Sequence, residues 1–187
     1  VPENPRYTIV DSVVDSLRFT VDKTLRQCEK GHLASISSFV DPEAAIMGWH
    51  DFGYLEGPGW AAYAAGGAYE IYAFGGFLGR KEWQDKALLI LDHVLGCGFI
   101  DETTGFIKSY RLTPEGIAAK KPADPFCLNY KHNSDWLCPG SMAKVAYQLL
   151  IFADELGDER RAPRMRAAAA RCAEWLCANL PAVENGW

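Results

Sequence analysis

The chain has 187 residues, of which 49% are hydrophobic, and a formal net charge of −5. This length suits one domain with a buried core, and the composition excludes a disordered chain. Acidic and basic residues are interspersed, without a basic stripe or a polybasic segment, so we expect neither nucleic acid nor a membrane as a partner. The oligomeric state is left open.

The sequence favours a cytoplasmic location. No apolar run reaches the roughly 18 residues that a membrane span needs, and the start at Val1 lacks the pattern of a signal peptide. A signal peptide removed earlier would leave the same start, so a secreted or periplasmic location stays open. The cysteines form no C-x-x-C pair and no zinc-site spacing, which predicts structural thiols, no metal and no cofactor. They are Cys28, Cys97, Cys127, Cys138, Cys172 and Cys177.

The first predicted element is one amphipathic helix over residues 8–30. Apolar residues recur there at steps of three and four, which predicts one buried face. Gly31 is predicted to end this helix as a left-handed cap, and His32 to interact with the helix terminus. A long connection follows up to Gly59, and long ordered loops are usually functional. The apolar positions are Ile9, Val10, Val13, Val14, Leu17, Val21 and Leu25.

Two helical hairpins follow in the prediction. Residues 60–78 contain one charge, which predicts a helix buried on nearly every side, whereas residues 83–95 carry one apolar stripe. The second helix is therefore half exposed, with His93 at the surface or half-buried. A tight turn joins this inner helix to its outer helix, and the order returns in residues 141–156 and 159–180. The arginines of the last segment are interpreted as a solvated face: Arg160, Arg161, Arg164, Arg166 and Arg171.

Three features recur along the chain: a Pro-Gly pair before each inner helix, a Leu-Gly pair after it, and a Gly-aromatic pair further on. The shifts are 81 (139 − 58), 78 (156 − 78) and 81 (186 − 105) residues. This spacing indicates an internal repeat of helical hairpins. The pairs are Pro58-Gly59 and Pro139-Gly140, Leu78-Gly79 and Leu156-Gly157, and Gly105-Phe106 and Gly186-Trp187.

We expect an all-α fold built from helical hairpins of an (α/α)6 toroid, with residues 1–187 as a single, partial domain. Solenoid repeats usually run about 30 to 50 residues with short connections. Here residues 96–134 separate an outer helix from the next inner helix, which fits a ring better than a solenoid. In such a ring the long loops gather at one mouth. Two hairpins and one leading helix fill only part of it.

The loops before the two inner helices each hold a carboxylate beside a histidine and aromatic residues. Asp51 lies in residues 49–56, and Asp135 lies in residues 130–136. Desolvation raises the pKa of a carboxyl group and a neighbouring donor lowers it, so two carboxylates in one pocket can divide the roles of acid and base. The alternative is helix capping, for which Asp51 is too far from residue 60, whereas Asp135 could cap a turn near Trp136.

The same loops carry groups suited to a sugar. Trp and Tyr faces stack on the C–H face of a pyranose. Lys108 and Arg111, between the two carboxylates, could hold a sugar carboxylate, unless they are solvated loop charges. The candidate substrate-binding residues are Trp49, His50, Trp60, Arg111, His132 and Trp136.

Residues 50–54, His-Asp-Phe-Gly-Tyr, followed by an inner helix rich in Ala and Tyr, resemble a motif of the unsaturated glucuronyl and rhamnogalacturonyl hydrolases, which are six-hairpin glycosidases. The layout of residues 49–180 is similar too, because a hairpin, a Gly-aromatic segment and an Asp before another inner helix follow. The resemblance implies that an aspartate protonates the C4=C5 bond of an unsaturated uronic acid and activates water for attack at C5. The glycosidic link is then lost. By position, Asp51 matches the first family aspartate and Asp135 the second, catalytic one.

The chain also departs from that family. Residues 136–140, Trp-Leu-Cys-Pro-Gly, replace the start of an apolar helix, and the preceding loop is longer, so a sugar epimerase or a polysaccharide lyase stays open. The Asp-rich motif of a terpenoid cyclase and the zinc set of a prenyltransferase are not evident. A non-catalytic helical-repeat scaffold would instead separate Asp51 from Asp135. We favour a carbohydrate-active hydrolase with an oligosaccharide substrate.

Overall fold

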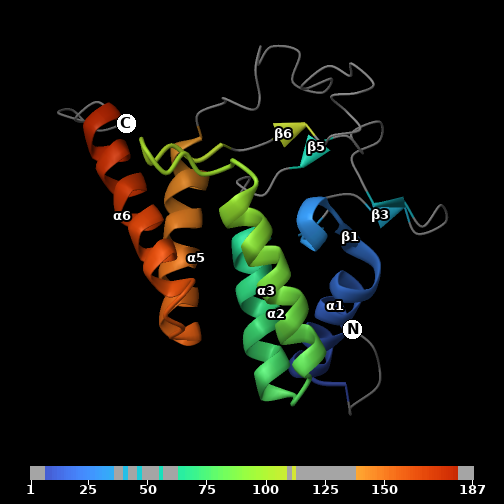
Figure 1. The fold of residues 1–187 in the computed structure, drawn as a ribbon. Coiled ribbons are helices and arrows are strands. Elements are labelled where there is room, and N and C mark those ends of the chain that lie inside the picture. Colours follow the sequence, from blue (N-terminus) through green and yellow to red (C-terminus); the bar gives the residue numbers. More distant parts are fainter. Residues whose placement is uncertain are drawn as a thin grey trace, which may run out of the picture.

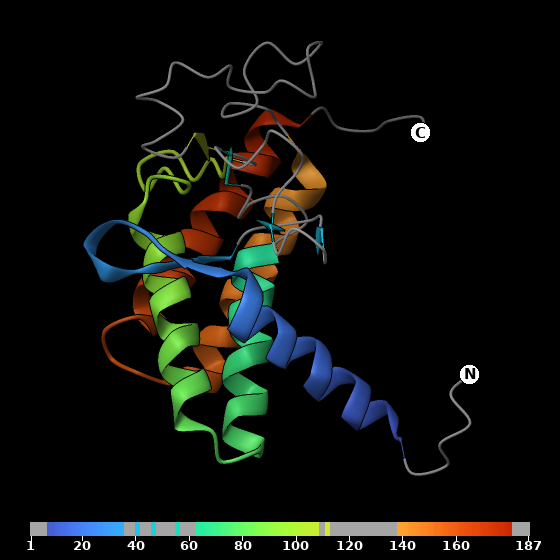
Figure 2. The ribbon, with the colours of Figure 1, turned by 90° about the vertical axis from the view of Figure 1, so that its right-hand side faces the viewer.

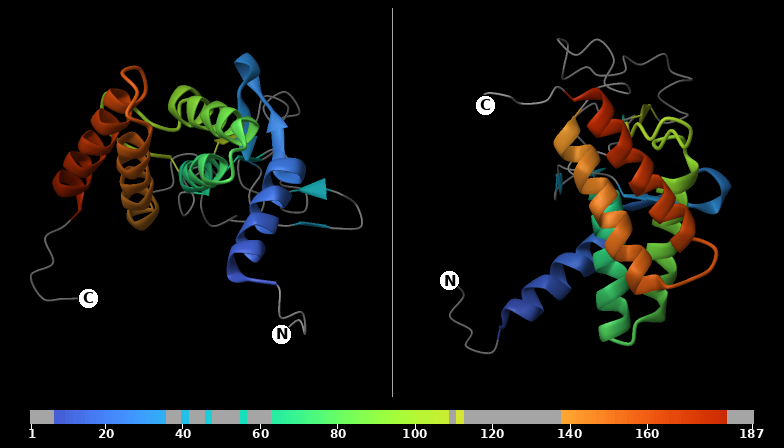
Figure 3. Two further views of the ribbon diagram at one scale, coloured as in Figure 1. Left: turned by 90° about the horizontal axis from the view of Figure 1, so that it is seen from below. Right: turned by 90° about the vertical axis from the view of Figure 1, so that its left-hand side faces the viewer.

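The computed structural model describes residues 7–35, 40–41, 46–47, 55–56, 63–108, 111–112 and 138–180. These residues are mostly helical, with three short antiparallel strand pairs, which is compatible with the predicted all-α fold, whereas the toroid stays a prediction (Figure 1). Seen from below, the helices stand in a row, with α5 and α6 first, then α2 and α3, then α1 (Figure 3). The α-helices are α1 (Ile9–Phe19), α2 (Tyr63–Phe77), α3 (Lys81–Gly96), α5 (Pro139–Leu156) and α6 (Ala162–Asn179). None of the described helices has the length and apolar character needed to cross a bilayer.

Helix α1 begins with a capping box and ends in a π-helical turn, Thr20–Thr24. The Asp11 backbone N–H donates to the Thr8 hydroxyl at 3.2 Å, and the Thr8 backbone N–H donates to the Asp11 carboxylate at 2.7 Å. Two backbone donors at the helix start are thereby satisfied.

The predicted buried face of α1 is correct only for its last part. Leu17 and Val21 are buried and Val13 is half-buried, but Ile9 is 86% exposed and Val10 is exposed as well. Figure 2 shows why, because α1 runs away from the other helices toward the N-terminus. Only the end of α1 that touches the bundle buries its apolar residues.

The prediction of one helix over residues 8–30 is wrong beyond the π-helical turn. The chain instead forms a hairpin of β1 (Leu25–Gln27) and β2 (Leu33–Ser35), in which Leu25 pairs with Ser35. The helical spacing of apolar residues includes only Leu25 after Val21, so a longer helix would bury little more. The hairpin packs two half-buried leucines, Leu25 and Leu33, on the core and buries Ala34.

The residues that were predicted to end the helix, Gly31 and His32, lie in the turn of this hairpin. Gly31 has the left-handed backbone expected of a cap, with φ 74°, but it follows Lys30, whose φ is 60°, in the 3-10 turn Glu29–Gly31. The backbone N–H of Cys28 then donates to the carbonyl of His32 at 3.0 Å. Gly31 and His32 therefore close a β-hairpin rather than an α-helix, and their predicted roles are wrong.

Helices α2 and α3 form the first predicted hairpin, which is confirmed within the described residues. Gly79 has φ +66° in the turn between them. A Cβ at Gly75 would lie 3.0 Å from the Cβ of Trp83, so this small residue lets the two helices approach closely. Trp83 is fully buried there. Residues 60–62 of the predicted inner helix lie outside the described part of the chain.

Helices α5 and α6 form the second predicted hairpin, which is also confirmed. α5 begins at Pro139, two residues before the predicted start, because a proline suits the first turn of a helix. Gly157 ends it with φ 60° in the left-handed region. α6 begins at Ala162 rather than at residue 159, and Asp158 accepts the backbone N–H of Ala162 at 3.2 Å.

The two inner helices, α2 and α5, lie side by side and run in the same direction (Figure 1). Phe152 packs against Tyr69 and Tyr72, with ring centroids 5.9 and 5.3 Å apart. Nearer the helix starts, a Cβ at Gly66 would meet the Gln148 side chain at 3.3 Å. These partners are 82 (148 − 66) and 80 (152 − 72) residues apart, the spacing of the predicted repeat.

The segment after α3 folds back on itself and packs against α6. Ile100 forms a bridge with Ile107, and Phe106 packs on Trp175 with ring centroids 5.2 Å apart. Gly105 has φ +84°, and a Cβ there would lie 2.2 Å from the carbonyl oxygen of Arg171. Only glycine fits that position, so the predicted Gly105-Phe106 turn is confirmed. Its repeat partner, Gly186-Trp187, lies outside the described residues.

Candidate functional site

Helices α2 and α5 begin at the same end of the molecule, the upper end in Figure 1. A short strand pair lies at that end too, formed by β5 (Leu55–Glu56) and β6 (Arg111–Leu112). Another pair of the same size, β3 (Val40–Asp41) with β4 (Ile46–Met47), precedes them in the chain. The two inner helices therefore begin at one end of the bundle, while residues 57–62 and 113–137, which lead into them, lie outside the described part of the chain.

Arg111 is the one predicted site residue whose backbone the structure places. It pairs with Glu56 across the strands β5 and β6, while Leu55 pairs with Leu112. Glu56 is five residues after Asp51 (56 − 51). The pairing joins the segment directly after the His-Asp-Phe-Gly-Tyr motif to the segment that carries Arg111.

The other predicted site residues lie outside the described part of the chain. They are Trp49, His50, Asp51, Trp60, His132, Asp135 and Trp136. Their roles in acid–base catalysis and sugar binding stay predictions. The described elements that lie near Asp135 and Asp51 in the chain are α5, which starts at Pro139, four residues after Asp135 (139 − 135), and the pair β5–β6.

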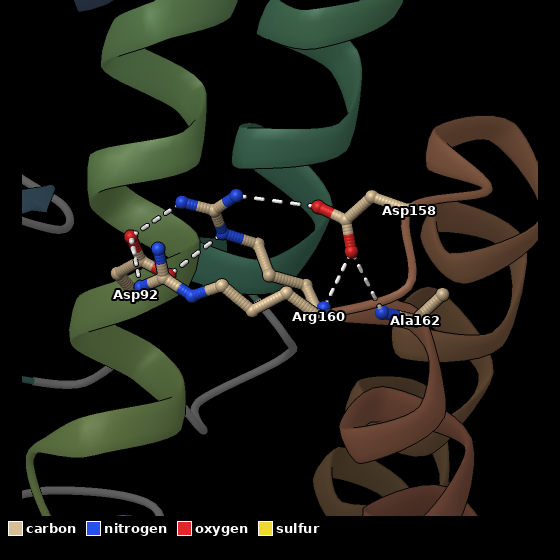
Figure 4. Close-up of polar contacts among 5 residues, drawn as sticks. Asp92, Asp158, Arg160 and Ala162 are labelled. Carbon is tan, nitrogen blue, oxygen red and sulfur yellow. Dashed lines mark hydrogen bonds and ion pairs between the residues drawn. The ribbon is translucent and has the colours of Figure 1, made fainter.

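The most extensive polar cluster in the described residues joins α3 to the turn between α5 and α6 (Figure 4). The Arg161 guanidinium donates through Nε and Nη2 to the two oxygens of Asp92, at 2.8 and 2.7 Å. It also donates through Nη1 to Asp158 at 3.2 Å, and Arg160 lies 3.8 Å from Asp92. The fork of Arg161 thus bridges two carboxylates from different hairpins.

The electrostatics of this cluster favour the charged forms. Partial burial opposes ionisation of Asp92, but the hydrogen bond and charge of Arg161, with the charge of Arg160, lower the pKa of Asp92 overall. Burial likewise acts against ionised Asp158, and the backbone N–H groups of Arg161 and Ala162 outweigh it and lower the pKa of Asp158. The bond to Asp92 raises the pKa of Arg161. A cluster so fully ionised and paired is structural rather than catalytic.

The interpretation of the arginines around α6 as a solvated face is wrong for Arg161, which directly precedes α6, whereas Arg160, Arg164 and Arg166 are exposed as interpreted. Arg161 has only 16% of its side chain exposed. Arg164 donates through Nη2 to the carbonyl oxygen of Leu95 at 2.5 Å and forms an ion pair with Glu102. Charge runs in the sequence do not reveal these bonds, because their acceptors lie more than 60 residues away.

A second cluster brings together side chains that the sequence did not connect. His93 was predicted to lie at the surface or half-buried, but it is 2% exposed. Its Nδ1 lies 3.2 Å from the Sγ of Cys28, and its ring packs edge to face on His32, with centroids 6.4 Å apart. The hairpin β1–β2, which replaces the last part of the predicted helix, brings Cys28 and His32 to α3.

In the described residues, no three histidine, cysteine, aspartate or glutamate side chains form a set that could hold a metal ion. Cys172 has the character predicted for a structural thiol, since it is buried and burial raises its pKa to about 11. Such a thiol stays protonated at neutral pH.

Comparison of the chain with protein-family models, with curated proteins and with solved structures found no match.

Proposed function

We propose that this protein is a carbohydrate-active hydrolase of the six-hairpin type, whose hairpins belong to an (α/α)6 toroid and whose substrate is an oligosaccharide that contains an unsaturated uronic acid. The observation that carries the proposal is the parallel arrangement of α2 and α5, which begin at one end of the bundle. Each is preceded by a loop with a carboxylate, a histidine and aromatic residues.

Asp51 and Asp135 are the acid and base in this proposal. Asp135 is three residues before Cys138 (138 − 135), and a chain of three residues spans at most about 11 Å. Asp51 is four residues before Leu55 of β5 (55 − 51), and β5 pairs with the strand that carries Arg111. Cys138 and Leu55 both lie at the end of the molecule where the inner helices begin. This supports a shared pocket for Asp51 and Asp135.

The chemistry needs two carboxylic groups in different states. One protonated carboxyl delivers its proton to the C4=C5 bond, and a carboxylate takes a proton from the water that attacks C5. Trp49, Trp60 and Trp136 offer apolar faces for the ring, and His50 and His132 offer hydrogen bonds. Arg111 provides the cation for the uronate. We place the protein in the cytoplasm, because its thiols suit a reducing compartment.

Turnover of an unsaturated disaccharide tests the proposal, because loss of the C4=C5 bond removes its ultraviolet absorbance. Asp51→Asn and Asp135→Asn should each lower kcat at least about 100-fold, since general acid–base groups contribute on that order. The matched control is Asp154→Asn on α5, an exposed carboxylate that pairs with Arg166, and its activity should stay within about twofold of wild type.

Two results would contradict the assignment. Activity retained in both Asp51→Asn and Asp135→Asn would exclude them as acid and base. A crystal structure with the two carboxyl groups farther apart than about 10 Å would favour a binding scaffold, because groups that share one sugar ring lie within about 5 to 10 Å.

A further inference from the structure

Cys28 and His93 form a thiol–imidazole pair between the β1–β2 hairpin and α3. The Sγ of Cys28 lies 3.2 Å from Nδ1 of His93, although the residues are 65 positions apart. His93 is buried, while Cys28 is half-buried. This is the geometry in which an imidazole nitrogen takes the proton of a thiol.

The imidazole is held firmly in this position. Its ring packs edge to face on Phe99 and on His32, each with centroids 6.4 Å apart. This packing keeps Nδ1 next to the Cys28 sulfur, and the thiolate that forms when Nδ1 takes the thiol proton is the nucleophilic form of cysteine.

The other four cysteines of the described residues lie in different surroundings. Cys97 is half-buried, and its Sγ lies 3.9 Å from the carbonyl oxygen of Val94. Cys138 is half-buried like Cys28, but its Sγ contacts the hydroxyl of Ser141 at 3.1 Å, and a hydroxyl does not act as a base at neutral pH. Cys172 is buried, and Cys177 is exposed on α6. Cys138 and Cys177 therefore serve as internal references for a half-buried and an exposed thiol.

We propose that Cys28 is a site of oxidative modification, a nucleophilic thiol that His93 activates toward hydroperoxides. In the first step Nδ1 of His93 takes the thiol proton. The Cys28 thiolate then attacks one oxygen of hydrogen peroxide, so that an S–O bond forms, the O–O bond breaks and the sulfur loses two electrons. The departing hydroxide takes the proton from His93 and leaves as water, with a sulfenic acid on Cys28. This site does not depend on the proposed sugar chemistry.

The folded wild-type chain is treated with less than one equivalent of hydrogen peroxide, and sulfenic acid is trapped with dimedone and measured for each cysteine by peptide mass spectrometry. Cys28 should form the adduct about ten times faster than Cys138 and Cys177, because an activated thiol reacts through a larger thiolate fraction. A rate at Cys28 equal to or below that of the exposed Cys177 would overturn the proposal.

The variant His93→Asn separates activation from simple access. The asparagine side-chain oxygen falls near the position of Nδ1 and accepts the thiol hydrogen bond, but it takes no proton at neutral pH. The rate at Cys28 should fall about tenfold, to the rate of Cys138, whereas the control Ser141→Ala should leave it unchanged. An unchanged rate in a folded His93→Asn would overturn the proposal. If circular dichroism shows this variant unfolded, the wild-type comparison of Cys28 with Cys177 decides alone.

Discussion

Arg80 and Arg161 occupy equivalent places in the two hairpins and make different contacts. Each stands one residue before its outer helix, α3 or α6, and the two are 81 residues apart (161 − 80). Arg80 stays within its own hairpin, with its guanidinium carbon 4.8 Å from the centre of the Trp83 ring. Arg161 reaches Asp92 in the neighbouring hairpin (Figure 4).

This difference distinguishes the features that form each hairpin from the contact that joins the two hairpins. The turn, the buried helix faces and the spacing recur in both copies, because any helical hairpin needs them. The bond between copies depends on one side chain and its partner. Asp92 and Arg161 each have 16% of their side chain exposed, so water screens this pair far less than it screens the surface pair Lys81–Asp85.

The largest expected effect is that of removing the bridge. Arg161→Ala leaves the Asp92 carboxylate without its main partner and should lower the free energy of unfolding by about 2–4 kcal/mol. Arg80→Ala removes only a cation–π contact and should cost about 0.5–1 kcal/mol. Urea denaturation followed by circular dichroism measures both. Equal costs at the two positions would show that the inter-hairpin bridge adds nothing beyond the local contact.

The double variant Asp92→Ala/Arg161→Ala is the control for that result. It removes both charges together and should cost clearly less than the sum of the two single substitutions, because the Asp92 carboxylate is no longer left without its partner. Additive costs would mean that the two residues act separately.

A smaller effect is expected on the pH dependence of stability. The folded pKa of Asp92 lies below its unfolded value, because its bonds to Arg161 outweigh the opposing effect of burial. Its contribution is therefore present above the unfolded pKa, about 3.9, and is lost as the pH falls through the folded pKa. The stability advantage of wild type over Asp92→Asn should stay constant from about pH 6 to 8 and shrink below about pH 4. The stability advantage of wild type over Arg80→Ala should not change with pH. If both advantages shrank equally at low pH, Asp92 would not be the cause of the change.

Sequence patterns predicted the repeated parts well and the singular parts poorly. The almost wholly apolar sequence of α2, the stripe of α3 and the turn residue Gly157 follow from local rules of burial and backbone geometry, so both hairpins were predictable. The hairpin β1–β2 was not, because Leu25 continues the helical spacing and only the tertiary contacts decide against it. The bond from Arg161 to Asp92 and the contact of His93 with Cys28 join residues 65 or more positions apart, which no local pattern specifies.

The candidate site shows the same division. The sequence predicted that the loops before both inner helices share one end of the fold. The parallel helices α2 and α5 both begin at one end of the bundle. The pairing of Glu56 with Arg111 could not be predicted, since strands of two residues have no periodicity. Asp51 and Asp135 stay predictions, drawn from a motif of five residues and from their position before the inner helices.

The smallest expected effect tests whether the two turns are equivalent. Gly79 and Gly157 have φ of 66° and 60°, and a Cβ at either position would meet nothing within 4 Å. Ala at each position should therefore cost only the backbone strain of a left-handed residue, about 1 kcal/mol in both hairpins. Asn at the same positions should cost less, because its side chain tolerates this backbone region. If thermal or urea unfolding shows equal losses of stability for the two substitutions, the two turns are equivalent. The hairpins then differ in side-chain contacts such as those of Arg161. A much larger loss for Gly157→Ala would instead mean that the bridge to Asp92 depends on the shape of the α5–α6 turn.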